Sequence, residues 1–281
     1  MKIGAHVSTS GGVHNAINNA LSIEAECIQI FASSPRTWTF KKQDDSSVDK
    51  FLNEINNIPV FLHGSYLINI GGDGQHLHKS INSLIDHMIA AHQLKAKGVI
   101  FHCGSHKGAG FQAVFDQAVN CLKSVLHETP DETLLIIENS AGAGGQIGSK
   151  LAEIGQLISK VNNPRLTVCV DTQHTLASGY DISKPGTLQS FADEFEREIG
   201  VQRLVAVHAN DSKTDLGSAK DRHENIGQGY IGDHGFRNIM RHELFKEVPF
   251  ILEVPGIEGN GPDLININRL KTIREELSVT E

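Results

Sequence analysis

The sequence predicts an α/β protein whose single domain, residues 1–281, folds as a (β/α)8 barrel, also called a TIM barrel. Eight short apolar runs recur without polar alternation, as in parallel strands that are buried on both faces. Segments with helical spacing of apolar residues lie between these runs. The residues that mark the ends of successive runs are 25 to 45 positions apart, which is the length of one βα unit. A doubly wound open sheet is the structural alternative.

Each predicted strand has a marker residue at or near its end, and a helical segment follows it. In chain order the markers are His6, Phe31, His63, His102, Glu138, Asp171, His208 and Glu253. The first helical segment is expected to bury one apolar face, formed by Val13, Ala16, Ile17, Ala20 and Leu21. A later helix has a similar face, formed by Ile81, Leu84, Ile85, Met88 and Ile89. The last helical segment, near residues 263–277, completes the eighth unit.

Composition predicts a soluble globular protein of the cytoplasm, with no membrane association. Hydrophobic residues make up 39% of the chain and charged residues 21%, and no apolar stretch has the length of a membrane span. The start, MKIGAHVS, has neither the apolar region nor the cleavage site of a signal peptide. The four cysteines show no paired spacing, which predicts reduced thiols. A formal charge of −8 argues against a generally basic surface but allows a local basic or metal-rich site.

Six consecutive predicted strands, the third to the eighth, end in a residue type that binds metals. In a (β/α)8 barrel the carboxyl ends of the strands meet at one mouth, where active sites lie. Three more such residues follow in the loops, so the candidate ligands are His63, His102, Glu138, Asp171, His174, His208, Asp221, His223 and Glu253. Imidazoles and carboxylates without cysteine suit Zn²⁺, Mn²⁺ or Fe²⁺. Nine ligands imply two or three ions, because one ion takes three or four protein ligands.

Each of these residues also has an ordinary structural interpretation. A histidine such as His63 or His102 can simply be hydrogen-bonded at the end of a strand. Asp171 can cap the next helix, and Asp221 can pair with a basic neighbour. Six consecutive strands that all end in a ligand-type residue are better explained by a common function at the mouth. The pattern therefore predicts a multi-metal site. His106, in FHCGSH, is expected to face the mouth, where it could support the ligands.

Eight ordered motifs extend over essentially the whole chain: GAHVS, HGSYLIN, FHCGSH, IENSAG, VDTQHTLASGYD, HANDSK, DRHENIGQG and LEVPG. Together they resemble the endonuclease IV family of apurinic/apyrimidinic endonucleases. The resemblance implies an enzyme of base excision repair that acts on double-stranded DNA. Such an enzyme cuts the phosphodiester 5′ to an abasic site, leaves a 3′-hydroxyl and a 5′-deoxyribose phosphate, and trims blocked 3′ ends. We also expect a monomer.

The resemblance further implies three zinc ions per chain, with Mn²⁺ able to substitute at one or more sites. The first ion would take His63, His102 and Glu138. The second would share Glu138 and also take Asp171, His208 and Glu253. The third would take His174, Asp221 and His223. Chain spacing alone instead places Asp171 and His174 on the same ion.

Catalytic and DNA-binding roles follow from the same resemblance. Glu138 and Glu253 are the expected catalytic residues, since Glu138 would bridge the ions that hold the attacking water and Glu253 would orient or deprotonate it. Tyr66 and Leu67, together with Arg36 from SSPRTW, are expected to wedge into the duplex where a base is missing. The alternative is that Tyr66 and Leu67 fold back on the barrel rim.

Two other functions are compatible with parts of this pattern. A sugar isomerase or epimerase also carries His, Asp and Glu at barrel strand ends, but it needs only one or two metals. The pair Asp221 and His223 would then be surplus. A non-catalytic metal-binding or scaffold protein would leave the glycine-rich loops at the mouth without a purpose.

Overall fold

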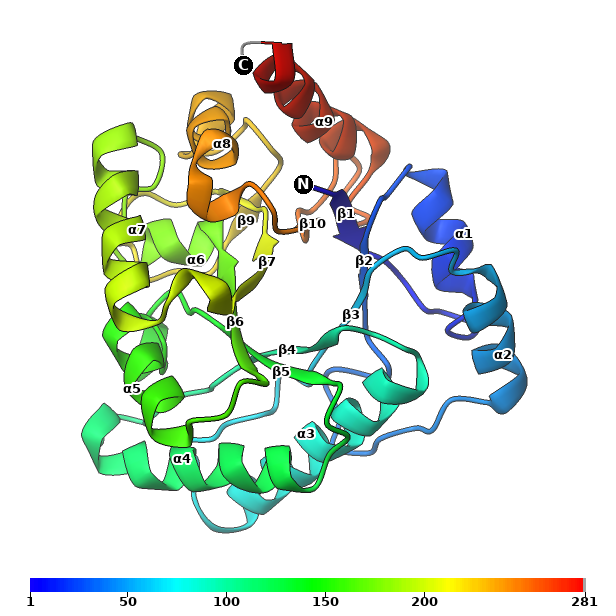
Figure 1. Ribbon diagram of the computed structural model, residues 1–281, viewed down its shortest axis with the longest axis vertical. Coiled ribbons are helices and arrows are strands. Elements are labelled where there is room, and N and C mark those ends of the chain that lie inside the picture. The colour runs from blue at the N-terminus through cyan, green and yellow to red at the C-terminus, as the bar shows by residue number, and fades with distance from the viewer. Residues whose placement is uncertain (280–281) are drawn as a thin grey trace.

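Eight parallel strands close into a barrel in the computed structural model, which describes residues 1–279 (Figure 1). The strands are β1 (Ile3–His6), β2 (Ile28–Ile30), β3 (Val60–His63), β4 (Gly98–His102), β5 (Leu134–Glu138), β6 (Leu166–Asp171), β7 (Leu204–His208) and β10 (Phe250–Leu252). Around the barrel their order is β1-β10-β7-β6-β5-β4-β3-β2. The predicted (β/α)8 barrel is therefore confirmed. Residues 280–281 of the predicted domain range lie outside the described residues.

Helices surround the barrel on its outer side (Figure 1). They are α1 (Asn15–Ser22), α2 (Asp45–Glu54), α3 (Gly74–Gln93), α4 (Phe111–His127), α5 (Leu151–Val161), α7 (Pro185–Glu198), α8 (Gly232–Arg241) and α9 (Leu264–Val279). The short helix α6 (Thr172–Ala177) follows β6 directly and is buried. The loop after β7 contains a small antiparallel hairpin, β8 (Asp211–Ser212) with β9 (His223–Glu224). The final helix, α9, packs against β1 and so joins the two ends of the chain. Within residues 1–279, no helix combines the length and the apolar character needed to cross a membrane.

The predicted apolar helix faces are correct only in part. Ala20 in α1 and Met88 in α3 are fully buried, but the next residues are not, since Leu21 is 60% exposed and Ile89 is 39% exposed. Consecutive residues of an α-helix are about 100° apart, so the second member of each pair turns away from the barrel. The prediction for the cysteines agrees with the structure, where all four are buried and free.

A layer of apolar side chains fills the barrel interior below the mouth. It takes one residue from, or next to, each of seven strands: Cys27, Phe61, Ile100, Ile136, Cys169, Ala206 and Ile251. On β1 the matching position is Gly4, where a Cβ would lie 1.7 Å from the Cys27 carbonyl oxygen, so only glycine fits. Side chains alternate along a strand, and the residue two positions further therefore also points inward, one level nearer the mouth. These residues are His6, Gln29, His63, His102, Glu138, Asp171, His208 and Glu253.

Candidate metal centre

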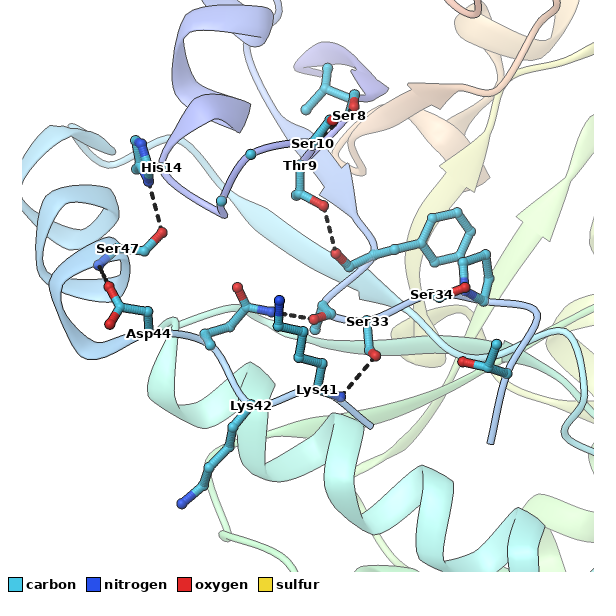
Figure 2. Close-up of a pocket in the computed structure, with 18 of the residues that line it drawn as sticks. Ser8, Thr9, Ser10, His14, Ser33, Ser34, Lys41, Lys42, Asp44 and Ser47 are labelled. Atoms are coloured by element: carbon cyan, nitrogen blue, oxygen red, sulfur yellow. Dashed lines mark hydrogen bonds between the residues drawn. The ribbon is translucent and has the colours of Figure 1, made fainter. Parts of the chain in front are cut away.

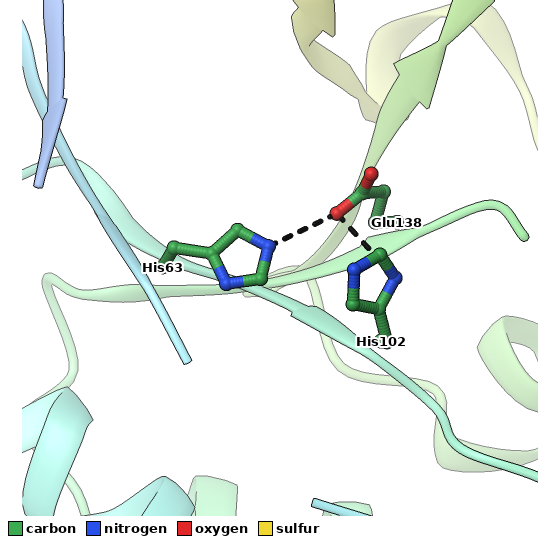
Figure 3. Close-up of side chains that lie close together, drawn as sticks. All are labelled: His63, His102 and Glu138. Atoms are coloured by element: carbon green, nitrogen blue, oxygen red, sulfur yellow. Dashed lines mark hydrogen bonds and ion pairs between the residues drawn. The ribbon is translucent and has the colours of Figure 1, made fainter. Parts of the chain in front are cut away.

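The inward side chains of the upper level converge on Glu138, which ends β5 and is 1% exposed. Its Oε2 lies 3.2 Å from Nε2 of His63 and 3.6 Å from Nδ1 of His102 (Figure 3). Its Oε1 lies 3.0 Å from Nδ1 of His208 and 3.2 Å from Nδ1 of His174. Oε2 of Glu138 thus faces His63 and His102, whereas Oε1 faces the candidate ligand nitrogen of His208. This is the arrangement that a carboxylate bridging two cations requires.

Burial alone would favour the neutral form of these carboxyl groups. It raises the pKa of Glu138, but the surrounding histidines, chiefly His102 and His208, hold that pKa well below its usual range. The same holds for the pKa of Glu253, where burial is outweighed chiefly by the charge of His208 and by the neighbouring His6. Both groups are therefore carboxylates at neutral pH, and buried anions of this kind need positive partners.

Three groups of donor atoms lie close enough to hold a metal ion, with all atoms of a group within 4.8 Å of one another. The first group is His63, His102 and Glu138. The second is Glu138, Asp171, His208 and Glu253. The third is Asp171, His174 and His223. Neighbouring groups share a carboxylate, so the three form one continuous cluster.

The distances between donor atoms match those around a small divalent cation. Donors arranged tetrahedrally at bond lengths of about 2.0–2.2 Å are about 3.3–3.6 Å apart. In the first group the His63 and Glu138 donors are 3.2 Å apart. In the second, Nδ1 of His208 and Oε2 of Glu253 are 3.3 Å apart. These separations leave space for an ion between the atoms of each pair.

Backbone carbonyl groups fix the tautomer of three of the histidines. Nδ1 of His63, His174 and His223 lies 2.8, 3.0 and 3.3 Å, respectively, from a main-chain oxygen. A carbonyl oxygen only accepts hydrogen bonds, so Nδ1 carries a proton, and in the neutral ring Nε2 then keeps its lone pair. In each case Nε2 faces a carboxylate oxygen at 3.2 to 3.4 Å. Lone pairs that converge in this way repel one another unless a cation lies between them, so these residues fit a metal.

Asp221 joins the third group from the β7–α8 loop. Its Oδ2 lies 3.3 Å from Nε2 of His174, and its Oδ1 lies 3.4 Å from Nε2 of His223. Both nitrogens are buried and have no hydrogen-bond partner among the described residues. The i,i+2 spacing of Asp221 and His223 thus brings the two side chains together, as the sequence predicts.

Asp171 caps a helix and also lies among the candidate metal ligands, the two roles that the sequence leaves open. Its Oδ1 accepts the backbone N–H of His174 at 2.9 Å and so caps α6. Its Oδ2 lies 3.6 Å from Nε2 of His223 and 3.9 Å from Nδ1 of His208. One oxygen therefore holds the helix, while the other lies between the second and third donor groups.

The predicted DNA-contacting residues lie at the rim of the mouth. Tyr66 is 51% exposed, and its ring packs edge-on against Phe31 with the centroids 5.5 Å apart. The carbonyl oxygen of Pro35 accepts the N–H of Tyr66 at 2.9 Å, which joins the loop of Arg36 to the loop of Tyr66. Arg36 is exposed, and Leu67 is half-buried. Tyr66 thus rests on the rim and still presents about half of its surface outward.

Two residues beside the donor groups have no role predicted from the sequence, although one of them, His6, marks the first strand end, and a third, His106, is predicted to lie there. Gln29 and His6 both contact the carboxylate of Glu253. Both side chains point inward by the two-residue alternation along a strand, but that alternation alone does not show which residues they contact. His106 instead stabilises its own loop, because its Nδ1 accepts the N–H groups of Gly108 and Gly110.

Comparisons with known proteins agree with this fold and cluster. A family described as xylose isomerase-like TIM barrel matches residues 17–281. A relative from Halothermothrix orenii named probable endonuclease 4 is 38% identical over 276 residues, which cover 96% of this chain and 99% of that protein. The crystal structure of endonuclease IV from Thermus thermophilus superposes with a TM-score of 0.86 at 31% identity, covering 98% of this chain and 100% of that one.

A D-tagatose 3-epimerase-like protein also superposes, with a TM-score of 0.74 over 100% of this chain and 98% of its own. At 15% identity, that likeness shows the fold alone. The barrel and the polar cluster at its mouth define an enzyme of the xylose isomerase-like TIM-barrel class. Within this class the chain belongs to the endonuclease IV family of apurinic/apyrimidinic endonucleases, as its full-length similarity to those relatives shows.

Proposed function

We propose that this protein uses bound metal ions to hydrolyse the phosphodiester 5′ to an abasic site in double-stranded DNA. The cut leaves a 3′-hydroxyl and a 5′-deoxyribose phosphate, and the same site trims blocked 3′ ends. The observation that carries this proposal is the continuous cluster of three donor groups at the mouth, in a chain that matches an endonuclease 4 relative over 96% of its length. A sugar isomerase or epimerase would need fewer donors.

Three ions, zinc with Mn²⁺ as a possible substitute, would occupy the cluster. We assign His63, His102 and Glu138 to the first, Glu138, Asp171, His208 and Glu253 to the second, and His174, Asp221 and His223 to the third. When bound, these ions supply positive charge that activates water and offsets the charge developing on the phosphate. The fixed tautomers of three ligands support this assignment, because they direct the lone pairs in advance.

Glu138 and Glu253 carry the catalytic roles of the chain itself. Glu138 holds the first two donor groups at a fixed separation, since each of its oxygens serves a different group. Glu253 lies at the open end of the second group and is half-buried, so its carboxylate can meet a water that enters from the mouth. There it orients the attacking water and accepts the proton that the water releases.

Tyr66, Leu67 and Arg36 recognise the lesion. The exposed part of Tyr66 and the neighbouring Leu67 insert where a base is missing and replace the lost stacking. Extruding a nucleotide costs a few kcal/mol, and least where the base is already absent. Selectivity then comes from the ease of deforming the damaged duplex more than from contacts to base edges.

A cavity of about 920 Å³ beside the mouth offers a path for the sugar–phosphate backbone (Figure 2). It lies between the loops that follow β1 and β2, and His6 forms part of its lining. Hydroxyl groups such as those of Thr9 and Ser33 line it, together with the exposed Lys41 and Lys42. Hydroxyl and ammonium groups are common partners of phosphate oxygens, so we place the strand next to the lesion here.

A nicking assay tests the proposed function. The metal-loaded protein should cut a duplex with one abasic site immediately 5′ to that site, leave an intact duplex uncut, and fail to turn over ketoses. His102→Ala should abolish nicking, whereas His92→Ala, which removes an exposed histidine of α3, should not. Turnover of a ketose without nicking would instead support the isomerase or epimerase alternative.

A further inference from the structure

The amide of Gln29 lies fully buried at the level of the donor cluster, in β2. Its Nε2 donates to Oε1 of Glu253 at 2.6 Å and lies 2.8 Å from Nδ1 of His6. Its Oε1 lies 2.8 Å from Nε2 of His208. Gln29 therefore connects strands that meet only in the closed barrel, and each of its polar atoms has a partner.

The chemistry of these partners permits one orientation of the amide. A carboxylate only accepts hydrogen bonds, so the NH₂ group of Gln29 must face Glu253 and its oxygen must face His208. An amide oxygen also only accepts, so Nε2 of His208 must carry a proton. Nδ1 is then the ring nitrogen available as a ligand, and it faces Oε1 of Glu138 at 3.0 Å and Oε2 of Glu253 at 3.3 Å.

We infer that Gln29 is a positioning residue. It fixes His208 in the tautomer whose Nδ1 is free to bind a metal ion, and it turns Oε2 of Glu253 towards the second donor group. It does for His208 what main-chain carbonyls do for His63 and His174, but with a side chain that also binds the neighbouring carboxylate. This inference rests on the proposed metal centre. Partners of this kind typically change metal affinity or activity by about 10–100-fold when they are removed.

Gln29→Leu tests the inference, because it removes all three polar contacts with little change in volume. The purified protein, loaded with zinc, is titrated with a competing chelator in the absence of DNA. We expect the variant to lose one ion about 10–100-fold more readily than the wild type. In ¹⁵N-histidine NMR spectra of the zinc-loaded wild type, the ring assigned through His208→Gln should show a protonated Nε2 and a metal-bound Nδ1, and Gln29→Leu should lose this signature.

Cys27→Ala is the matched control. Cys27 precedes Gln29 by two positions, is also fully buried, and belongs to the apolar layer below the donor groups. It should lower the melting temperature but leave zinc retention and the ring signals of His208 unchanged. Wild-type zinc retention and ring signals in Gln29→Leu would overturn the inference, and so would an equal loss of zinc from Cys27→Ala.

Gln29→Glu separates the contact with His208 from the contact with Glu253. It also tests the inference if Gln29→Leu does not fold. It keeps an acceptor for Nε2 of His208 but places a like charge beside Glu253. We expect the His208 ring signature to persist while kcat falls and KM changes little, and loss of that signature would contradict the inference. A wild-type protein that binds zinc as described but does not nick abasic DNA would refute the proposed function alone.

Discussion

Nε2 of His174 lies 3.3 Å from Oδ2 of Asp221, so a histidine buried in α6 meets a carboxylate of the β7–α8 loop that is 48% exposed. The far part of this loop is anchored by Asp211, whose carboxylate accepts the N–H groups of Gly227 and Ile231 at 2.9 Å each. The loop is therefore held in place by hydrogen bonds within the protein. The third donor group is preformed as a result.

Asp221→Ala should remove one ion and leave the other two in place, because only the third group loses a donor. We expect the metal content to fall from about three ions per chain to about two, and abasic-site nicking to fall by about 100-fold, the scale on which metal-site residues act. Elemental analysis and a nicking assay of the same preparation measure both. Asp215→Ala, which removes an exposed carboxylate of the same loop, should change neither value.

Glu253→Gln should preserve the fold, since the two side chains are nearly isosteric, and should lower turnover by about 100-fold or more. The reason is that the variant loses both a proton acceptor and an anionic metal ligand. Steady-state nicking rates measure the effect, with circular dichroism as a check on folding and Glu258→Gln as an exposed control. Near-normal turnover with intact metal content would remove Glu253 from the mechanism.

Tyr66→Ala should strongly weaken the cleavage of an abasic duplex while sparing the hydrolysis of a small activated phosphodiester. The small substrate needs only the metal centre, whereas the duplex needs the wedge. Tyr66→Phe should retain most of the duplex activity, because it keeps the ring that packs on Phe31. Equal losses on both substrates would mean that Tyr66 supports the metal centre itself.

The donor residues could be predicted from the sequence because strand ends are visible in the pattern of apolar runs. Each ligand-type residue at a strand end lies two positions beyond an interior apolar residue, as His63 follows Phe61 and Glu138 follows Ile136. Barrel closure then brings these ends together regardless of their distance along the chain.

Gln29 could not be singled out in the same way. Glutamine is not a usual metal ligand, and the apolar run of its strand continues to Phe31, the residue that marks the strand end in the sequence. The importance of Gln29 comes from Glu253 and His208, which are 224 and 179 positions away in the sequence. Only the closed barrel shows that one amide contacts both residues.

His87 gives the fold a dependence on pH. It lies buried in α3 with its ring against Phe40, and burial lowers its pKa to about 4. Since the unfolded pKa is about 6.5, the neutral ring stabilises the fold fully above that pH. This contribution, about 3 kcal/mol, is lost as the pH falls from about 6.5 to about 4.

His87→Leu should therefore flatten the decline of the melting temperature between pH 7 and pH 4.5, because leucine has no proton to gain. Thermal denaturation followed by circular dichroism at several pH values measures this slope. His92→Leu, at an exposed position on the same helix, should keep the wild-type slope. A slope in His87→Leu as steep as that of the wild type would show that the acid sensitivity arises elsewhere.

The metal content of the purified, active protein tests the proposed three-metal centre most directly. Elemental analysis should find close to three zinc or manganese ions per chain, prolonged chelation should abolish nicking of an abasic duplex, and returning zinc should restore it. A fully active preparation that contains only one ion per chain would contradict the three-metal centre.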